Sequence, residues 1–289
     1  MTIPPSTFGI PALRTEDPRF LRGEGRYVEN IEIPGALRAV FVRSIFPHAV
    51  LGSVEGLETA RAMPGVAGVY TAEDLDLPHQ LAAGSVEVPG GDLDRPFERP
   101  ILASDRLRFV GEPLAMVVAE TLGQALDAAE SVLADAEPLP AVLDPEVAAA
   151  DDDLLFPETG TNIATRFEQR WDDDVLAGAD VTVRGRFVNQ RVAPVPMETN
   201  AIAVVPEDDG RFTVWVSSQV PFDVRGDLVD VLGVDRSRIR VIAPDVGGGF
   251  GAKVPTYPEY LVVAKAAAVL GRPVRWAESR SESMISMTH

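Results

Sequence analysis

The sequence predicts an α+β protein of about two domains. Its 289 residues are 46% hydrophobic and 24% charged, which is the balance of folded domains. Short runs rich in β-branched residues alternate with a few stretches of helical character. The 24 glycines and 24 prolines are spread along the chain and indicate short elements joined by tight turns.

The first half is predicted to fold as one small α+β domain over 20–145, preceded by an N-terminal arm at 1–19. Strands are predicted where β-favouring residues run together, at 36–43, 66–70 and 108–119. A short helix at 57–63 should stop at Pro64-Gly65. The irregular stretch 77–100 is predicted as a surface loop.

The clearest single element is a predicted helix at 121–136. Its apolar residues fall at helical spacing on one face: Leu122, Ala125, Leu126, Ala129, Val132 and Leu133. Asp127, Glu130 and Asp135 lie off that face.

The second half is predicted as a separate domain over 165–289, after a linker at 146–164. We expect strands at 182–189, 201–206, 211–217, 238–242 and 274–277. Helices are expected at 221–232, with proline in its first turn and Gly233 after its end, and at 257–270. A turn at Glu207-Asp208-Asp209-Gly210 should join two of the strands.

Charge and composition exclude several classes of function. Lys and Arg number 26 and Asp and Glu 44, a net charge of −18, so nucleic acid and anionic membranes are poor partners. With no cysteine, this chain can hold no disulfide, zinc–thiolate site or cysteine-ligated iron–sulfur cluster. Residues 1–20 lack a signal-peptide pattern, and apolar runs such as 114–119 are too short for membrane insertion. We expect a cytoplasmic protein.

A glycine-rich loop is the sharpest local motif. Gly247-Gly248-Gly249-Phe250-Gly251-Ala252-Lys253 lies between a predicted strand and a predicted helix. Glycines permit positive φ angles and expose backbone N–H groups, which near a helix N-terminus favour anions. The spacing fits neither the nucleotide phosphate loop, which ends in Gly-Lys-Ser/Thr, nor a complete dinucleotide fingerprint. Composition alone leaves a second interpretation open, in which the loop is a tight turn that binds no ligand.

This loop closely resembles the Gly-Gly-Gly-Phe-Gly-x-Lys loop of molybdopterin-binding subunits in the xanthine dehydrogenase/aldehyde oxidase family. Segments with the expected order and gaps accompany it: Pro196-Met197-Glu198, Ser217-Ser218-Gln219 and Arg238-Ile239-Arg240-Val241. The first domain resembles the family's hammerhead domain in segments that include Arg22-Gly23-Glu24-Gly25-Arg26-Tyr27 and Gly111-Glu112-Pro113. The resemblance implies a hammerhead domain followed by the first part of a mixed α/β molybdopterin-binding domain.

By this resemblance the cofactor is molybdopterin with molybdenum, possibly as the cytosine dinucleotide form. The resemblance implies cofactor-binding roles for Gln219, Gly248, Gly249, Phe250, Gly251 and Lys253. Phe250 would also border the substrate entrance, whereas Lys253 could equally serve packing. No residue is predicted to ligate the metal directly. The implied activity is hydroxylation of aldehydes, N-heterocycles or carbon monoxide, with water as the oxygen source, and the substrate is a small molecule.

The family's catalytic base is a glutamate in a Gly-x-Gly-Glu segment near the far C-terminal end of the large subunit, and no such segment occurs here. No catalytic residue is therefore predicted on this chain. A complementary C-terminal large-subunit chain, an iron–sulfur (2Fe–2S) subunit and an FAD subunit are the expected partners. A split subunit, a fragment and a non-catalytic interaction or assembly module remain alternatives.

Overall fold

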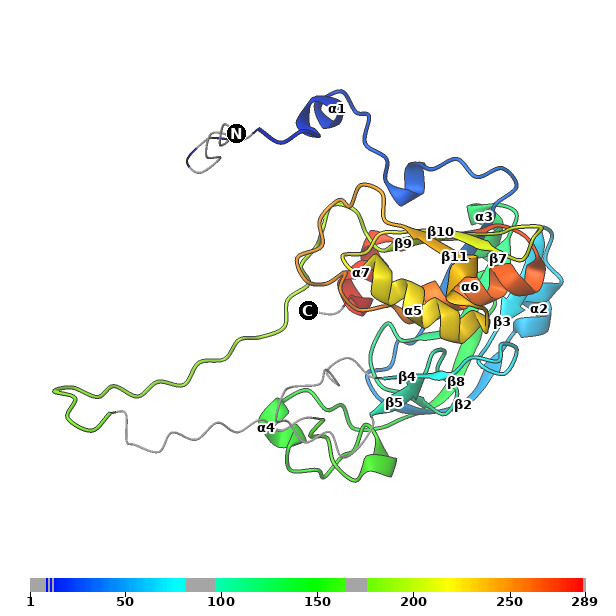
Figure 1. The fold of residues 1–289 in the computed structure, drawn as a ribbon. Coiled ribbons are helices and arrows are strands. Elements are labelled where there is room, and N and C mark those ends of the chain that lie inside the picture. Colours follow the sequence, from blue (N-terminus) through cyan, green and yellow to red (C-terminus); the bar gives the residue numbers. More distant parts are fainter. Residues whose placement is uncertain (1–8, 10, 12, 82–96, 165–175, 288–289) are drawn as a thin grey trace.

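A seven-stranded mixed sheet organises the molecule (Figure 1). The computed structural model describes residues 9, 11, 13–81, 97–164 and 176–287. From edge to edge the sheet contains β11 (Ile239–Ile242), β10 (Phe212–Val216), β9 (Ala201–Pro206), β12 (Val274–Ala277), β1 (Leu37–Arg43), β7 (Pro113–Ala119) and β3 (Val66–Tyr70). β1 and β12 pair in parallel, with Leu37 opposite Val274. Strands from both halves of the chain thus form a single sheet.

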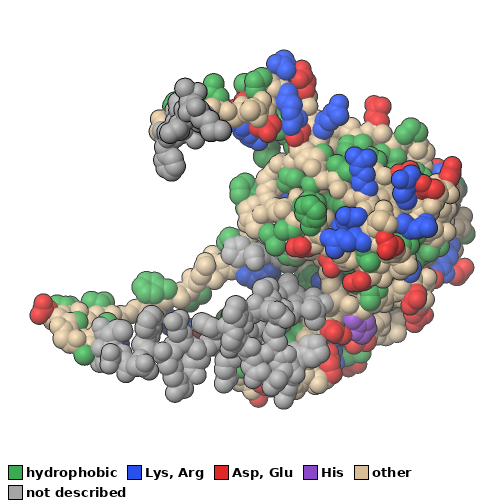
Figure 2. Space-filling model, viewed as in Figure 1, with side chains coloured by type: hydrophobic (Ala, Val, Ile, Leu, Met, Phe, Trp, Pro, Cys, Tyr) green, Lys and Arg blue, Asp and Glu red, His purple; other side chains and the backbone are tan. Residues whose placement is uncertain are grey.

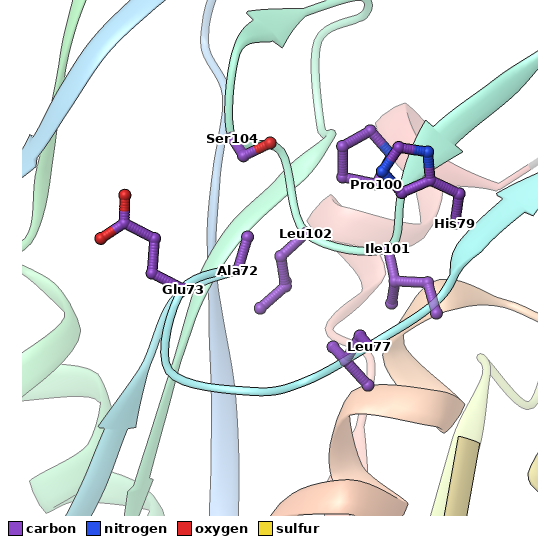
Figure 3. A pocket seen from close by; sticks show the side chains of 8 residues that line it. All are labelled: Ala72, Glu73, Leu77, His79, Pro100, Ile101, Leu102 and Ser104. Atoms are coloured by element: carbon purple, nitrogen blue, oxygen red, sulfur yellow. The ribbon is translucent and has the colours of Figure 1, made fainter.

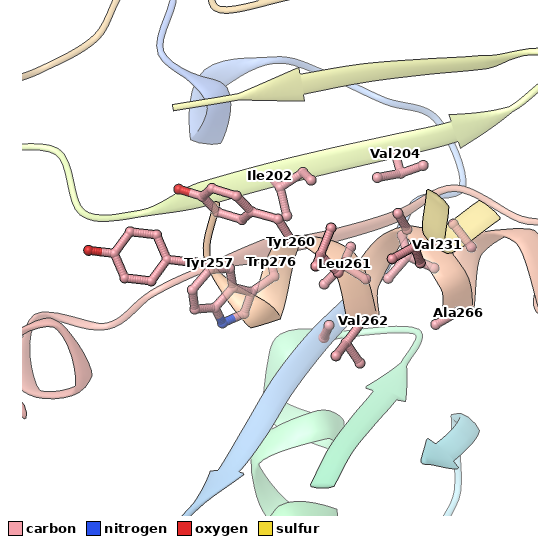
Figure 4. Close-up of a cluster of buried hydrophobic side chains, with 14 of the residues drawn as sticks. Ile202, Val204, Val231, Tyr257, Tyr260, Leu261, Val262, Ala266 and Trp276 are labelled. Carbon is pink, nitrogen blue, oxygen red and sulfur yellow. The ribbon is translucent and has the colours of Figure 1, made fainter. Parts of the chain in front are cut away.

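The larger core lies between this sheet and two helices, α5 (Pro221–Leu232) and α6 (Pro258–Leu270). Each helix has proline in its first turn and ends at a glycine with positive φ, and the sequence predicts both signals for α5. Figure 4 shows Tyr260 and Leu261 of α6 against Ile202 of β9 and Trp276 of β12. Aromatic edge contacts tie these elements together, with ring centroids 6.2 Å apart for Tyr260 and Trp276.

A second core lies where β7 meets a three-stranded sheet of β6 (Arg106–Leu107), β2 (Ala49–Glu55) and β8 (Leu133–Pro138). Two short helices contribute to it, α2 (Leu57–Arg61) and α3 (Leu122–Ala129). The predicted strands at 36–43 and 66–70 and the helix at 57–63 are confirmed within a residue or two. Within the predicted strand region 108–119, the strand covers Pro113–Ala119. Glu112, just before it, is a buried turn residue whose carboxylate accepts a hydrogen bond from the backbone N–H of Arg108 at 2.6 Å.

The predicted helix at 121–136 is wrong in its second half. α3 begins with a capping box between Thr121 and Gln124 and ends at Ala129. The chain then turns and forms β8, which pairs with β2. The buried face of α3 carries Ala125 and Ala128, whereas Leu126 is half exposed. The apolar residues after Ala129 are too few for their spacing to distinguish a helix from a strand. Pairing with β2 makes this part of the chain a strand.

The remaining elements are short. β4 (His79–Leu81) pairs with β5 (Glu98–Pro100) at the two ends of the predicted surface loop, whose middle lies outside the described residues. The others are α1 (Asp17–Leu21), α4 (Pro145–Ala148), α7 (Arg280–Ser286) and the 3-10 turns Val28–Asn30, Pro157–Thr159 and Arg236–Arg238. The predicted linker is locally ordered, because Asp151 accepts hydrogen bonds from Thr161 and Asn162. No helix in the described parts of the chain has the length and apolar character to cross a membrane.

Strands at 201–206 and 274–277 and the helix at 221–232 are confirmed, but the predicted strand at 182–189 is absent. Residues 181–192, here called the projecting segment, are extended, exposed and free of regular structure. In Figure 1 this part of the chain, coloured yellow-green, runs away from the packed body. A strand requires a partner for its backbone groups, and among the described residues this segment has none.

A buried charge cluster joins the two halves where β1 ends. The guanidinium of Arg43 donates to the carboxylate of Glu259 on α6 at 2.6 Å and to that of Glu282 on α7 at 2.8 Å. A third bond runs to the backbone carbonyl of Gly111 at 2.9 Å. Because Arg43 and Glu259 are both buried, removing either partner would leave a charge uncompensated.

Candidate functional site

The glycine-rich loop follows β11, as predicted, but the chain does not enter a helix directly after it. α6 begins only at Pro258, after a turn that includes the hydrogen bond from the N–H of Val254 to the carbonyl of Gly251. The loop therefore does not include the N-terminus of α6. Its capacity to bind a ligand depends on its own amide groups.

The loop favours glycine for two different reasons, backbone conformation and space. Gly248 has φ +99° and Gly251 has φ +87°, in the region that L side chains rarely adopt. At Gly249 the reason is space, because a Cβ atom would lie 2.4 Å from Oε1 of Gln219. Phe250 adopts φ +53° although it carries a side chain, and its ring is 74% exposed. A strained, exposed aromatic residue beside a close backbone approach is typical of a ligand site.

Gln219 is held by the loop that it contacts. Its Oε1 accepts the N–H groups of Gly251 at 3.0 Å and Lys253 at 3.2 Å. Its own backbone N–H donates to the carbonyl of Lys253 at 2.9 Å. Since Oε1 accepts bonds from the loop, the amide Nε2 of this exposed side chain is directed away from those donors. It has no protein acceptor in the described part of the chain.

Three successive amides of the loop are also unused. The N–H of Gly247 donates to Glu198, and that of Gly251 donates to Gln219. The N–H groups of Gly248, Gly249 and Phe250 between them have no acceptor among residues 13–81, 97–164 and 176–287. Such a row of donors suits a ligand rich in oxygen or nitrogen acceptors.

Lys253 supports the loop from inside the protein. Its side chain is fully buried, and Nζ donates to Oγ of Ser217 at 2.7 Å and to the backbone carbonyl of Glu198 at 2.9 Å. Oε2 of Glu198 lies 3.2 Å from Nζ and accepts the hydroxyl of Ser217 at 2.7 Å. Burial lowers the pKa of Lys253, and the Glu198 carboxylate opposes that shift. Lys253 therefore faces the interior, and Glu198 is a hydrogen-bonded structural carboxylate.

Sequence reasoning missed Asp245, two residues before the loop. Its carboxylate pairs with the guanidinium of Arg19 on α1 and accepts the backbone N–H of Arg26 at 2.7 Å. These hydrogen bonds, chiefly that from Arg19, lower the pKa of Asp245 to about 2. The N-terminal stretch is thereby fastened beside Gly247. The sequence signal for it was an aspartate three residues after the end of a predicted strand.

Other parts of the described structure are weaker candidates for a functional site than the glycine-rich loop. A shallow pocket is lined by Ala72, Glu73, Leu77, His79, Pro100, Ile101, Leu102 and Ser104. Glu73 and His79 lie on opposite sides of it and do not converge (Figure 3). No group of three or more His, Cys, Asp or Glu residues in the described ranges could hold a metal ion. The loop is the better candidate.

Comparison with known proteins identifies the class of protein. Residues 22–140 match the model of the aldehyde oxidase and xanthine dehydrogenase a/b hammerhead domain. Residues 155–289 match the molybdopterin cofactor-binding domain. The chain belongs to the xanthine dehydrogenase/aldehyde oxidase family and has the predicted α+β architecture, a hammerhead domain followed by the first part of a cofactor-binding domain.

Individual relatives agree with this assignment. The chain is 37% identical to the nicotine 6-hydroxylase large subunit of Paenarthrobacter nicotinovorans and 36% identical to the carbon monoxide dehydrogenase large chain of Afipia carboxidovorans, each over 96% of this chain. The crystal structure of quinoline 2-oxidoreductase from Pseudomonas putida 86 superposes with a TM-score of 0.87 at 34% identity, covering 96% of this chain and 35% of that one.

The matches cover only part of each relative. This chain spans 34% of the nicotine 6-hydroxylase large subunit and 35% of the carbon monoxide dehydrogenase large chain. About two-thirds of each relative therefore has no counterpart in the 289 residues.

Proposed function

We propose that this chain binds the molybdenum cofactor as part of a hydroxylase that oxidises aldehydes, N-heterocycles or carbon monoxide with water as the oxygen source. The observation that carries the proposal is the glycine-rich loop, with three unused amides beside the immobilised carboxamide of Gln219. These donors match a pterin cofactor, which is rich in oxygen and nitrogen acceptors. The family match to a molybdopterin cofactor-binding domain supports the same assignment.

In this proposal each residue of the loop has a physical role. The amides of Gly248, Gly249 and Phe250 hold the cofactor, and Gly251 keeps the carboxamide of Gln219 oriented so that Nε2 donates into the site. The ring of Phe250 borders the substrate entrance. Lys253 positions the loop from below through Glu198 and Ser217. When bound, the molybdenum cofactor supplies the redox chemistry, and the protein supplies orientation and hydrogen bonds.

The proposal extends to the parts not covered by this chain. A complementary C-terminal large-subunit chain would supply the base, a glutamate, and 2Fe–2S and FAD subunits would carry electrons away. The cytosine dinucleotide form of the cofactor and a cytoplasmic location belong to the same proposal. So do the domain limits of 1–19, 20–145, 146–164 and 165–289. The matched ranges 22–140 and 155–289 support the division into two domains.

The test is the cofactor content of the complex purified from its native host through a tag on this chain. We expect molybdenum and pterin in the wild-type complex. Gly249→Ala should lower both by at least about tenfold, because its Cβ atom would displace Gln219 and lose more than about 1.4 kcal/mol of binding. The measurements are metal analysis by mass spectrometry and fluorescence of the released pterin.

Gly226→Ala is the matched control. Gly226 lies in α5, and a Cβ atom there would meet no other atom within 4 Å. This variant should retain the wild-type cofactor content. A stable wild-type complex that contains partner chains but no molybdenum would contradict the proposal and favour the alternative, a non-catalytic assembly module.

A further inference from the structure

Residues 19–27, here called the strap, belong to the first half of the chain but bind the second half beside the glycine-rich loop. The guanidinium of Arg19 pairs with the carboxylate of Asp245, and the backbone N–H of Arg26 donates to the same carboxylate at 2.7 Å. In return, the backbone N–H of Asp245 donates to the carbonyl of Arg26 at 3.1 Å. These contacts fasten the strap two residues before the loop begins.

Most of the strap is exposed, so Asp245 is its main attachment to the second half. Among the described residues, the only hydrogen bonds between residues 19–27 and the second half are those of Asp245. Figure 2 shows basic (blue) and acidic (red) side chains interleaved at and just before α1, where the chain stands above the packed body. The carboxyl side of the ion pair is only 13% exposed, which favours a stronger interaction than that of a surface pair.

The attachment is passed on to the first glycine of the loop. A Cβ atom built at Gly247 would lie 2.5 Å from Cβ of Glu198 and 3.4 Å from the ring of Tyr27, so the strap and residue 198 enclose this backbone. The N–H of Gly247 donates to the carboxylate of Glu198 at 2.8 Å, and its carbonyl accepts the N–H of Glu198 at 3.1 Å. A shift of Asp245 would therefore move Gly247 and the free amides of 248–250 that follow it.

The first half also holds the far end of the same region. Nε2 of Gln80 on β4 donates to the backbone carbonyl of Thr256 at 2.6 Å, two residues before α6 begins. The strap and β4 thus hold residues 245–256 at both ends. A loop whose ends are fixed loses fewer conformations when it binds a ligand, so the affinity rises without any new contact to that ligand.

We infer that Asp245 is a positioning residue for the cofactor, because by holding the strap it preorganises the glycine-rich loop. The inference rests on the proposed function, which makes the molybdenum cofactor the ligand of that loop. Asp245 and Arg19 act through the loop and not by contact with the cofactor. Since coupling between two binding events is reciprocal, cofactor binding should in turn tighten the attachment of the strap.

A second ion pair of the same chemistry joins the two halves away from the loop. The guanidinium of Arg272 donates to both carboxylate oxygens of Glu120, at 2.9 and 3.2 Å. Arg272 follows the C-terminal end of α6, whereas the loop precedes its N-terminal end. A helix of 13 residues is about 20 Å long. Arg272→Gln is therefore a matched control, because it breaks an arginine–carboxylate pair between the halves without touching the loop.

The first test uses cofactor-free protein made in a host that does not synthesise molybdopterin. In Asp245→Ala, the amides of Gly247 and Gly251 should exchange with deuterium at least about tenfold faster than in the wild type, because the loop opens more often. The amides of α6 should keep their wild-type rates. The melting temperature should fall by no more than about 4 °C, as expected for the loss of one partly exposed ion pair.

Variants of the partner residue give a graded result. Arg19→Gln should speed exchange in the loop, and Arg19→Lys, which keeps the charge but not the paired geometry, should lie between Arg19→Gln and the wild type. Arg272→Gln should leave loop exchange unchanged. Wild-type loop exchange in Asp245→Ala would refute the inference. So would an equal increase in the loop and in α6, because that result would show a role in overall stability alone.

The second test measures molybdenum and pterin in the complex purified from its native host through a tag on this chain. Asp245→Ala should lower both by at least about threefold, and Arg272→Gln should lower neither. By reciprocity, the amides of Arg26 and Asp245 should exchange at least about threefold more slowly in the cofactor-loaded wild type than in the cofactor-free protein.

The two tests separate the inference from the proposed function. Full cofactor content in Asp245→Ala, together with faster loop exchange, would refute the positioning role and leave the proposed function standing. A wild-type complex without molybdenum would refute the proposed function and the cofactor as the ligand of the loop. The exchange rates of the cofactor-free protein would still show whether Asp245 orders the loop.

Discussion

At the scale of single residues, the buried ammonium of Lys253 links three segments that are far apart in sequence. It contacts the carbonyl and carboxylate of Glu198 and the hydroxyl of Ser217, and its backbone meets Gln219. Desolvation makes each unpaired member of such a cluster costly. The loop is therefore held in place by a hydrogen-bonded polar cluster beneath it, in which Oε1 of Glu198 is buried without a partner among the described residues.

Lys253→Met should lower the free energy of unfolding by about 3–5 kcal/mol, because it leaves the Glu198 carboxylate without its cation. In the double variant with Glu198→Gln, the loss should be smaller than the sum of the two single losses. Urea unfolding of the four proteins measures both quantities. Strictly additive losses would show that the two side chains do not interact.

At the scale of elements, α3 shows how burial differs from periodicity. The apolar spacing at 121–136 places both Ala125 and Leu126 on the packed face, but the structure buries Ala125 together with Ala128, which the spacing did not include. Small side chains allow the helix backbone to approach β1 and β7 closely. Leu126 is left half exposed.

This arrangement predicts opposite effects for two similar substitutions. Leu126→Glu should change the free energy of unfolding by no more than about 0.5 kcal/mol, as is usual at exposed positions. Ala128→Glu should destabilise by several times that amount, since it buries a carboxylate without a partner. Thermal unfolding followed by circular dichroism compares them. Equal losses would favour the helix face expected from spacing.

At the scale of the whole molecule, buried carboxylates gather where β12, α7 and β9 meet. Glu278 is 4% exposed, and burial raises its pKa to about 7. The hydroxyl of Ser286 and the backbone N–H of Asn200 donate to its carboxyl group, and Glu259 lies near enough to raise the pKa further. Arg43 acts in the opposite direction.

This shift predicts how stability depends on pH. Below about pH 4.5 both the folded and unfolded forms of Glu278 are protonated, and its contribution to stability is complete. As pH rises towards 7 the unfolded chain has lost the proton that the folded chain retains, so the contribution falls, by up to about 3 kcal/mol. Glu278→Gln should remove this component, so the stability difference between wild type and variant should change between pH 5 and pH 8 in urea unfolding. A constant difference would contradict the shift.

Much of the second half could be predicted from sequence. The helix at 221–232 begins at a proline and ends before a glycine, and the strands 201–206 and 274–277 are short runs bounded by turns. These signals act within a few residues, so they can be read without knowing the fold. The loop at 247–253 and Gln219 were identified through motifs whose order and gaps resemble those of a family, and the family assignment is confirmed.

Features that depend on contacts between residues far apart in sequence were decided only by the tertiary structure. Whether 133–138 is helix or strand depended on β2, and whether 182–189 forms a strand depends on a partner that the described residues do not supply. The inward direction of Lys253 and the salt bridge of Asp245 with Arg19 depend on groups 55 and 226 residues away. Local backbone preferences are set by neighbouring residues and can be read from the sequence. Pairing of strands and burial of charge depend on which surfaces meet, and only the folded chain determines that.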